Sequence, residues 1–126
     1  MLRNQVTDPL FPECPVRNVL VRIGDKWAVL VLLTLDEKKH PMRYKDILQC
    51  IPDISQKMLG VTLRELEADG LVKRMAYAEV PPRVEYELTD RSRSLMPHIL
   101  NLVEWSLNHF TDILKDRKAF MKKKGR

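Results

Sequence analysis

Two cysteines are the side chains of this sequence best suited to covalent chemistry. Cys14 stands directly before Pro15, and proline is favoured at the first position of a helix. The N-terminal end of a helix stabilises a thiolate, and Arg17 adds a positive charge one turn later, although Glu13 opposes it. We therefore expect Cys14 to react as a thiolate with hypochlorite, peroxides, quinones or aldehydes.

The second cysteine, Cys50, lies between Gln49 and Ile51, beside the apolar face of a predicted helix. A free cysteine in such a position is commonly a small buried side chain. Burial is therefore the favoured interpretation of Cys50, and a redox role is the alternative.

A second set of residues is suited to contact with nucleic acid. A predicted helix follows Ser55 and begins with glutamine and lysine, which are types that meet base edges and phosphates. Glycine at position 60 costs the helix about 1 kcal/mol, which indicates contact or crowding there. The predicted contacts in and around this helix are Arg43, Ser55, Gln56, Lys57, Gly60, Val61 and Arg64.

Two short β-rich segments follow the helix and add three basic residues to this set. Lys73 and Arg74 precede the turn between the segments, and Arg83 follows it. The prolines of Val80-Pro81-Pro82 stiffen the turn, so an arginine beside it can be aimed at a phosphate or at the minor groove. Two helices followed by such a β-wing predict binding to double-stranded DNA, with the second helix in the major groove.

The residue patterns of enzymes and metal sites are missing from the sequence. His40, His98 and His109 form no pair at a metal-ligand spacing, and His109 with Asp112 is half a site at best. The chain has no glycine-rich phosphate loop, nucleophile elbow or Ser/His/Asp set. A thiol oxidoreductase using Cys14 would normally show a CxxC motif or a nearby histidine. We therefore expect no enzyme activity, no cofactor and no metal.

The elements that position these residues can be predicted from helix caps and apolar periodicity. Ser55 caps the DNA-contacting helix and Gly70 ends it, while Thr89 caps a long last helix. The buried stripe of the DNA-contacting helix is Met58, Leu59, Leu63 and Leu66. The predicted elements are helices at 15–23, 26–36, 43–51 and 56–69, strands at 71–77 and 83–88, and a helix from residue 90.

These elements predict one domain of the α+β class, mainly α, with a winged helix-turn-helix fold. The domain covers residues 14–114, between an N-terminal arm at 1–13 and a basic C-terminal tail at 115–126. Within it the helix-turn-helix spans 43–70 and the wing 71–89. The competing interpretation is a small α+β domain whose helix pair only packs, because Glu65, Glu67 and Asp69 make the end of the helix acidic.

The net charge of +5 does not by itself indicate a nucleic-acid partner. Residues 115–126 hold seven basic residues and one acidic residue, and the remaining 15 basic and 16 acidic residues nearly cancel. The longest apolar run, residues 27–35, is too short for a membrane span, and the N-terminal sequence lacks a secretion signal. With two distant cysteines, these features predict a cytoplasmic protein with no membrane partner.

Five segments, in order over about residues 14–110, match a known family. They are Cys14-Pro15-Val16, Ile23-Gly24-Asp25-Lys26-Trp27, Ile54-Ser55-Gln56-Lys57-Met58-Leu59, Leu63-Arg64-Glu65-Leu66-Glu67-Ala68-Asp69-Gly70-Leu71-Val72 and Val80-Pro81-Pro82-Arg83-Val84-Glu85-Tyr86-Glu87-Leu88-Thr89. With these segments the chain closely resembles the HxlR family of bacterial transcriptional regulators, which are winged-helix proteins related to the MarR type.

The resemblance implies a homodimer on a near-palindromic operator, with N- and C-terminal dimerisation helices and one recognition helix in each half-site. Half-sites are then expected about one helical turn apart, or a multiple of that. Trp27 and Trp105 are expected in the core or in the dimer interface. The chain departs from many relatives at Gly60-Val61, where they have a polar or basic pair, and at Arg91-Ser92-Arg93, where glycine is common.

The resemblance also implies a redox switch, because some family members sense oxidants or electrophiles through a cysteine that matches Cys14. The sharper hypothesis is a disulfide between Cys14 of one subunit and Cys50 of the other, which requires Cα atoms within roughly 7 Å. The alternatives are control by a small ligand, regulation without a redox switch, and a winged-helix protein-interaction module. The sequence does not fix whether the protein activates or represses.

Overall fold

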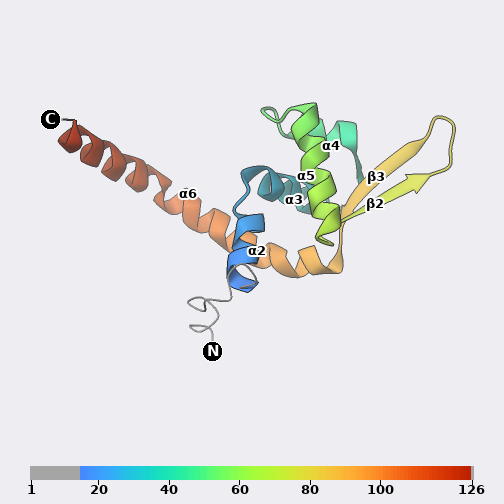
Figure 1. Ribbon diagram of the computed structural model, residues 1–126, viewed down its shortest axis with the longest axis horizontal. Helices are drawn as coiled ribbons and strands as arrows, with labels where there is room; N and C mark the ends of the chain where they lie inside the picture. The colour runs from blue at the N-terminus through green and yellow to red at the C-terminus, as the bar shows by residue number, and fades with distance from the viewer. Residues whose placement is uncertain (1–14, 126) are drawn as a thin grey trace. The chain divides into compact units, whose positions relative to one another are not determined.

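A computed structural model describes residues 15–125 and divides the chain into two units, with the boundary between Ser94 and Leu95. Figure 1 labels the helices and strands. In chain order they are α2 (Pro15–Ile23), α3 (Lys26–Lys38), β1 (Met42–Arg43), α4 (Tyr44–Cys50), α5 (Gln56–Ala68), β2 (Val72–Tyr77), β3 (Arg83–Leu88) and α6 (Asp90–Lys124). The α4–α5 pair followed by the β2–β3 hairpin confirms the predicted winged helix-turn-helix, an α+β fold that is mainly α.

Two helices begin at the caps that the sequence predicts. Asp25 accepts hydrogen bonds from the backbone N–H groups of Trp27 and Ala28, at 2.9 and 3.0 Å. Ser55 Oγ accepts one from the N–H of Met58 at 3.0 Å. Each bond satisfies an N–H that the first helical turn leaves without a partner. The start of α5 is therefore set by the residue directly before it.

The end of α5 and the start of α6 also follow the prediction. Gly70 has a φ of +71°, the left-handed conformation in which helices often end. The Leu71 N–H donates to the Leu66 carbonyl at 2.9 Å, which closes the helix end. At the start of α6, Thr89 Oγ1 accepts a hydrogen bond from the Ser92 N–H at 3.3 Å.

Helices α3, α4 and α5 bury their apolar sides in the core of the first unit. Leu32, Ile47 and Leu59, one from each helix, are at most 1% exposed. Met58 departs from the predicted stripe: it is 38% exposed, and Thr62 is buried instead. The reason is helical geometry, since Leu59, Thr62, Leu63 and Leu66 share one side at 3.6 residues per turn and position 58 lies beside it. The other buried apolar residues of this unit are Ala28, Val31, Leu35, Met42, Ile51, Ile54, Val72 and Leu88.

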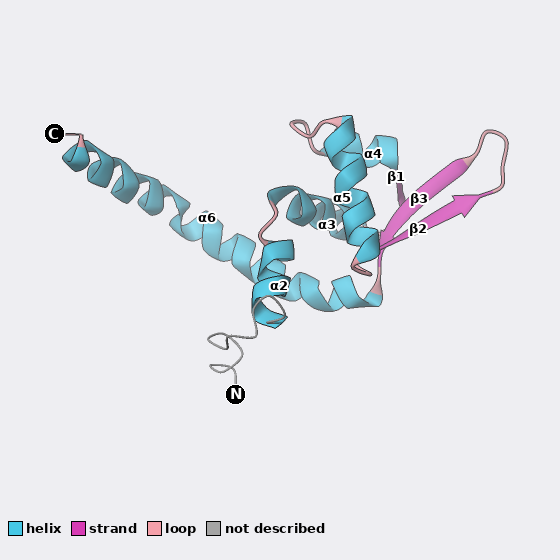
Figure 2. Cartoon of the chain, viewed as in Figure 1, coloured by secondary structure: helices cyan, strands magenta, loops and turns pink. Residues whose placement is uncertain are grey.

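Three antiparallel strands form one sheet in the order β1-β3-β2, and Figure 2 shows β2 and β3 extending as a hairpin. In β1, Met42 pairs with Tyr86 and Arg43 pairs with Glu85. Strand β1 was not predicted, because two residues are too few to show a period of two. It joins the segment before α4 to the wing.

The second unit consists of α6 from Leu95 onward, and the predicted basic tail is helical as far as Lys124. Met96 and Ile99 are buried, whereas Trp105 is 53% exposed and stacks on His109 with ring centroids 4.4 Å apart. The exposed large apolar residues of this unit are Leu100, Leu102, Trp105, Leu107, Phe110, Ile113, Leu114, Phe120 and Met121. In the part of the chain that the structure describes, no helix is both long and apolar enough to cross a membrane.

Candidate nucleic-acid interface

One side of α5 carries the predicted DNA contacts in a row. Lys57, Val61 and Arg64 are exposed and follow one another at spacings of four and three, which places them on one side of the helix. Gly60 lies half-buried in the same row. The opposite side holds Leu59 and the rest of the buried stripe. The core thus fixes which side α5 presents to solvent.

The first turn of α5 is held in place by its own cap and by α4. The Tyr44 hydroxyl donates a hydrogen bond to the Gln56 carbonyl, which ties the first turn of α5 to α4. Ser55 uses its oxygen for the cap, and the side chain of Gln56 is exposed. The two predicted contacts in this turn therefore differ: Gln56 is available for base edges, while Ser55 has its hydroxyl hydrogen left to donate.

Gly60 leaves open space on the exposed side of α5. A Cβ placed on Gly60 would meet no atom within 4 Å. Packing inside the described chain therefore gives no reason for a glycine that costs the helix about 1 kcal/mol relative to alanine. Two reasons for a glycine at position 60 were predicted. Crowding within the chain is wrong, and close approach of another molecule's surface stays a prediction.

The pleat of the hairpin separates Lys73 from Arg74. Successive side chains of a strand point to opposite faces of the sheet. Val72 and Leu88 are paired across the hairpin and both are buried, so they mark the core face. Arg74 and its partner Tyr86 lie two positions further along their strands, and Arg74 therefore lies on the same face. Lys73 lies on the outer face, although it is the neighbour of Arg74 in the sequence.

The outer face of the sheet carries the other predicted basic residues together with acidic ones. By register the opposed pairs on this face are Arg43 with Glu85, Lys73 with Glu87 and Tyr77 with Arg83. The structure therefore does not bring the ten predicted contacts together. It groups Arg74 with the exposed side of α5 and places Arg43, Lys73 and Arg83 on the opposite face of the sheet.

A cavity of about 260 Å³ lies between α5 and the hairpin. Gly60, Leu63, Arg64 and Glu67 line it from α5, and Arg74 and Tyr86 line it from the strands. Neither Arg64 nor Arg74 forms an ion pair within 4 Å with a carboxylate in residues 15–125. Two positive charges thus reach the same space from two elements and outnumber the one carboxylate, Glu67, that also lines it. This excess of positive charge suits a phosphate contact by the two arginines.

Arg83 is held on the hairpin by two carboxylates. Its Nε donates to Glu79, its Nη1 lies 3.2 Å from Glu85 Oε2, and its guanidinium lies 3.8 Å from the Tyr77 ring centroid. The hydrogen bond to Glu79, followed by that to Glu85, raises the pKa of Arg83 above its ordinary value. Arg83 is therefore charged, but the two glutamates balance its charge. It can bind a phosphate only if the phosphate replaces one of these carboxylates.

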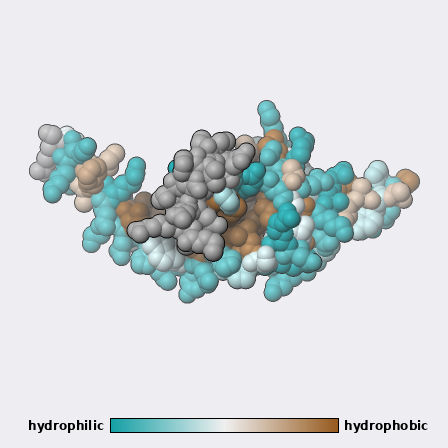
Figure 3. Space-filling view, turned by 60° about the horizontal axis from the view of Figure 1, so that its bottom comes forward, coloured by the Kyte–Doolittle hydropathy of each residue, from teal (hydrophilic) through white to brown (hydrophobic). Residues whose placement is uncertain are grey.

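The tip of the hairpin has a different character from the rest of the wing. Figure 3 shows hydrophobic surface at the end of the hairpin, on the right of the view. Val80 is fully exposed there, before Pro81 and Pro82. The wing therefore ends in apolar atoms, with the charge of Arg83 held behind them.

The structure describes one of the two cysteines. Cys14 lies outside the described residues. Cys50 is a free, exposed thiol at the last position of α4, so the interpretation of Cys50 as a buried side chain is wrong. The reason is that α4 ends there: Ile51 leaves the helix with φ −122° and ψ 90° and turns into the core, while Cys50 stays outside.

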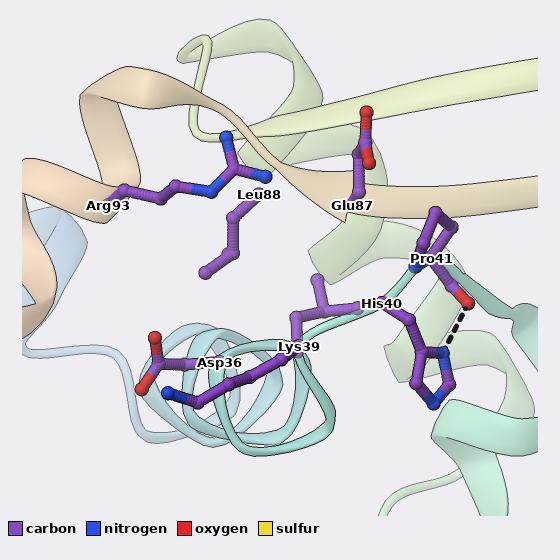
Figure 4. A pocket seen from close by; sticks show the side chains of 8 residues that line it. Asp36, Lys39, His40, Pro41, Glu87, Leu88 and Arg93 are labelled. Carbon is purple, nitrogen blue, oxygen red and sulfur yellow. Dashed lines mark hydrogen bonds between the residues drawn. The ribbon is translucent and has the colours of Figure 1, made fainter.

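A second cavity, of about 290 Å³, lies at the end of α3 and shares no lining residue with the first (Figure 4). Its apolar walls include Leu35 and Leu88. Lys39, which has a φ of +58°, lines it together with Arg93 on one side of the view, and Glu87 lies on the other. The remaining lining residues are Asp36, His40 and Pro41. Charges of both signs around apolar walls suit a small polar molecule.

Across residues 15–125, no three His, Cys, Asp or Glu side chains gather as metal ligands. His40 uses Nδ1 to donate to the Pro41 carbonyl at 2.8 Å, and His109 stacks on Trp105.

Comparison with known proteins matches most of the chain. Residues 22–113 match the family model described as HxlR-like helix-turn-helix. An uncharacterized HTH-type transcriptional regulator from Methanothermobacter thermautotrophicus is 49% identical over 92 residues, 73% of this chain and 69% of that protein. The uncharacterized HTH-type transcriptional regulator YybR from Bacillus subtilis is 42% identical over 107 residues, 84% of this chain and 82% of that protein.

Solved structures include a similar protein in two redox forms. The reduced form of the redox regulator HypR has a TM-score of 0.72 and 39% identity, with 81% of this chain and 98% of the HypR chain covered. Its oxidized form has a TM-score of 0.68 and 41% identity, with 75% and 96% covered.

Proposed function

Because the chain belongs to the HxlR-like helix-turn-helix family of transcriptional regulators, we propose that it is a homodimer that binds a near-palindromic operator in double-stranded DNA. The observation that carries this proposal is the exposed side of α5, where Lys57 and Arg64 stand beside uncrowded Gly60. Each α5 enters the major groove of one half-site with its first turn leading. Gln56 meets base edges, and Lys57, Arg64 and Arg74 contact phosphates.

The exposed apolar residues support the dimer. The second unit exposes Trp105, Leu107 and Phe110, each more than half, along α6. Helix α2 has no buried residue and exposes Leu20 by 58% and Val21 by 74%. Large exposed apolar surface is typical of a protein interface. We assign dimerisation to these two helices.

The thiol of Cys50 supports redox control. An exposed free thiol at the end of α4 is accessible to a partner cysteine, and HypR, a redox regulator by description, is 41% identical to this chain. Cys14 of one subunit and Cys50 of the other form a disulfide when an oxidant such as a peroxide removes two electrons and two protons from the thiols. The peroxide is reduced in the same step. The new bond shifts α4, and α4 is tied to the first turn of α5 through Tyr44.

Operator binding with and without oxidant tests this switch. We expect hydrogen peroxide to change the operator affinity of the wild type by about 5–150-fold, the usual range of allosteric coupling. Cys14→Ser is expected to lose that response, and Cys50→Ser to lose the cross-linked dimer on a non-reducing gel. Equal responses of wild type and Cys14→Ser would exclude the switch. Mass spectrometry without a cross-subunit Cys14–Cys50 peptide would exclude the disulfide and leave modification of Cys14 alone.

Replacement of Gly60 by alanine separates stability from DNA binding. The variant is expected to be more stable by about 1 kcal/mol, since alanine favours the helix and its Cβ meets nothing. The same methyl group stands where DNA is expected to approach, so operator affinity should fall. Urea denaturation and fluorescence anisotropy measure the two effects. A variant that is more stable and binds the operator as tightly as the wild type would show that no close approach occurs at Gly60.

The cavity at the end of α3 favours one alternative, control by a small ligand. A polar metabolite in that cavity would contact Lys39 and Arg93. Control by such a ligand would appear as a rise in the melting temperature when the metabolite is added. The rise would disappear in Lys39→Ala, while the response to oxidant would persist. A protein-interaction module without a DNA site is the other alternative, and the salt dependence of DNA binding distinguishes it.

A further inference from the structure

The C-terminal end of α5 is held by two arginines from elements on either side of it in the sequence. Arg22 Nε of α2 lies 3.0 Å from Asp69 Oδ2. Arg91 Nη1, at the start of α6, donates to the Asp69 carbonyl at 2.9 Å. Both arginines belong to the first unit, as does α5. Positive charge at a helix C-terminus is also favoured by the helix dipole. One residue at the end of the recognition helix therefore receives a contact from each helix that we assign to dimerisation.

The contact from α2 spans an open space. A cavity of about 310 Å³ lies between α5 and the segment that holds α2 and α3, lined by Val21 and Ala28 on one side and by Met58 and Thr62 on the other. Arg22 and Asp69 also line it. Helix α2 has no fully buried residue. The ion pair between Arg22 and Asp69 joins α2 to the end of α5 at this cavity.

Arg22 is itself anchored at its own helix. Its Nη1 donates to the Asn18 carbonyl at 3.0 Å while Nε faces Asp69. The guanidinium thus joins the last turn of α2 to the end of α5 with two bonds in a fixed plane. Its side chain is 49% exposed and that of Asp69 is 23% exposed. The contact can therefore break and form again without opening the core.

The contact from α6 depends on glycine at position 70. A Cβ placed on Gly70 would lie 2.5 Å from Arg91 Nη1, so a larger residue would displace the arginine. The Thr89 hydroxyl also donates to the Gly70 carbonyl at 2.7 Å. The chain after α5 is thus fixed by the side chains of Thr89 and Arg91, at the start of α6.

We propose that Arg22, Asp69 and Arg91 are positioning residues, which set the angle at which α5 is presented to the operator and transmit movements of α2 and α6 to it. The inference rests on the proposed function, because it concerns the recognition of an operator by α5. None of the three lies in the exposed row of α5 that meets DNA. They affect the discrimination between DNA sequences because they set the orientation of α5. They do not themselves contact a phosphate.

The test uses the full-length protein and two duplexes: an operator selected by the wild type from a randomised library, and a scrambled duplex of the same length. Arg22→Gln and Asp69→Asn are each expected to lower the ratio of operator to scrambled affinity by up to about five-fold per half-site, the scale of a partly exposed ion pair. The affinity ratio of the double variant should fall no further than that of either single variant, because both substitutions break the same ion pair. The exchange Arg22→Asp with Asp69→Arg should restore part of the ratio.

Two controls separate positioning from other roles. The salt slope on the scrambled duplex should match the wild type in all variants, because no phosphate contact is lost. Lys38→Gln removes an exposed charge at the end of α3 and should leave the operator ratio unchanged. Thermal denaturation confirms that the binding temperature lies below unfolding for each variant.

The outcomes distinguish this inference from the proposed function. If the library yields no operator for the wild type, the proposed function fails and the inference fails with it. If an operator is found and the Arg22 and Asp69 variants keep the wild-type ratio, the inference alone fails. An equal loss on both duplexes also overturns it, because that loss would reflect general DNA affinity.

Discussion

Replacement of Leu59 by alanine is expected to lower the free energy of unfolding by about 3–5 kcal/mol. Leu59 is fully buried, on the side of α5 that packs into the core with Leu32 and Ile47. Removal of its three outer carbon atoms leaves a space that the neighbouring helices fill only in part. Because a domain of this size has a total stability of about 5–15 kcal/mol, the loss is a large fraction of the whole. Urea denaturation followed by circular dichroism measures it.

The neighbouring residue provides a matched control for this measurement. Met58 belongs to the same helical turn but is 38% exposed, so Met58→Ala should cost less than about 1 kcal/mol. Equal losses at positions 58 and 59 would mean that α5 does not dock on the core in the described orientation. A loss confined to Leu59 would support that orientation, on which every proposed DNA contact depends.

An increase in salt from 50 to 200 mM is expected to weaken operator binding by about 10³–10⁵-fold. Each bound phosphate releases condensed counterions, so affinity falls steeply when six to ten contacts are made, roughly the number that two protomers can supply. The basic residues on the side of α5 proposed to meet DNA are Lys57, Arg64 and Arg74, which are exposed and form no ion pair within the described chain, so two protomers supply six such contacts. Fluorescence anisotropy at a series of salt concentrations gives the slope.

Two variants should change this slope in opposite directions. Lys57→Gln removes one contact per protomer and should lower the slope by about two in the dimer. Glu79→Gln removes the first carboxylate that holds Arg83, so Arg83 becomes freer to bind a phosphate and the slope should rise. A wild type whose DNA binding is weak and indifferent to salt would favour the protein-interaction module.

The parts of the fold that depend on neighbouring residues could be predicted from the sequence. Ser55 determines the start of α5 and Gly70 its end, because a cap and a left-handed glycine act within a few residues. The buried side of α5 followed from helical periodicity for Leu59, with an error at adjacent Met58. The exposed row on α5 was therefore predictable in advance, because it is the complement of the buried side.

The parts that depend on distant residues were not predictable. Whether Cys50 is buried depends on where α4 stops and on what covers its last turn. The state of Arg83 depends on Glu79 and Glu85, which the hairpin register brings beside it. Arg22 and Asp69 are 47 positions apart in the sequence and meet only in the folded chain. Local sequence patterns contain no information on such long-range contacts.

The division of charge by the hairpin pleat has a kinetic consequence. On the outer face of the sheet, Arg43, Lys73 and Arg83 are balanced by Glu85 and Glu87 and by Glu79 of the turn. The side of α5 with Arg74 keeps an excess of positive charge, because Lys57, Arg64 and Arg74 outnumber Glu67. If α5 meets DNA as proposed, we expect the field of DNA to turn a molecule with this asymmetry as it diffuses, so that α5 faces the duplex before any base is touched. Association is then fast and nearly blind to sequence. Discrimination between operators resides in how long each complex lasts.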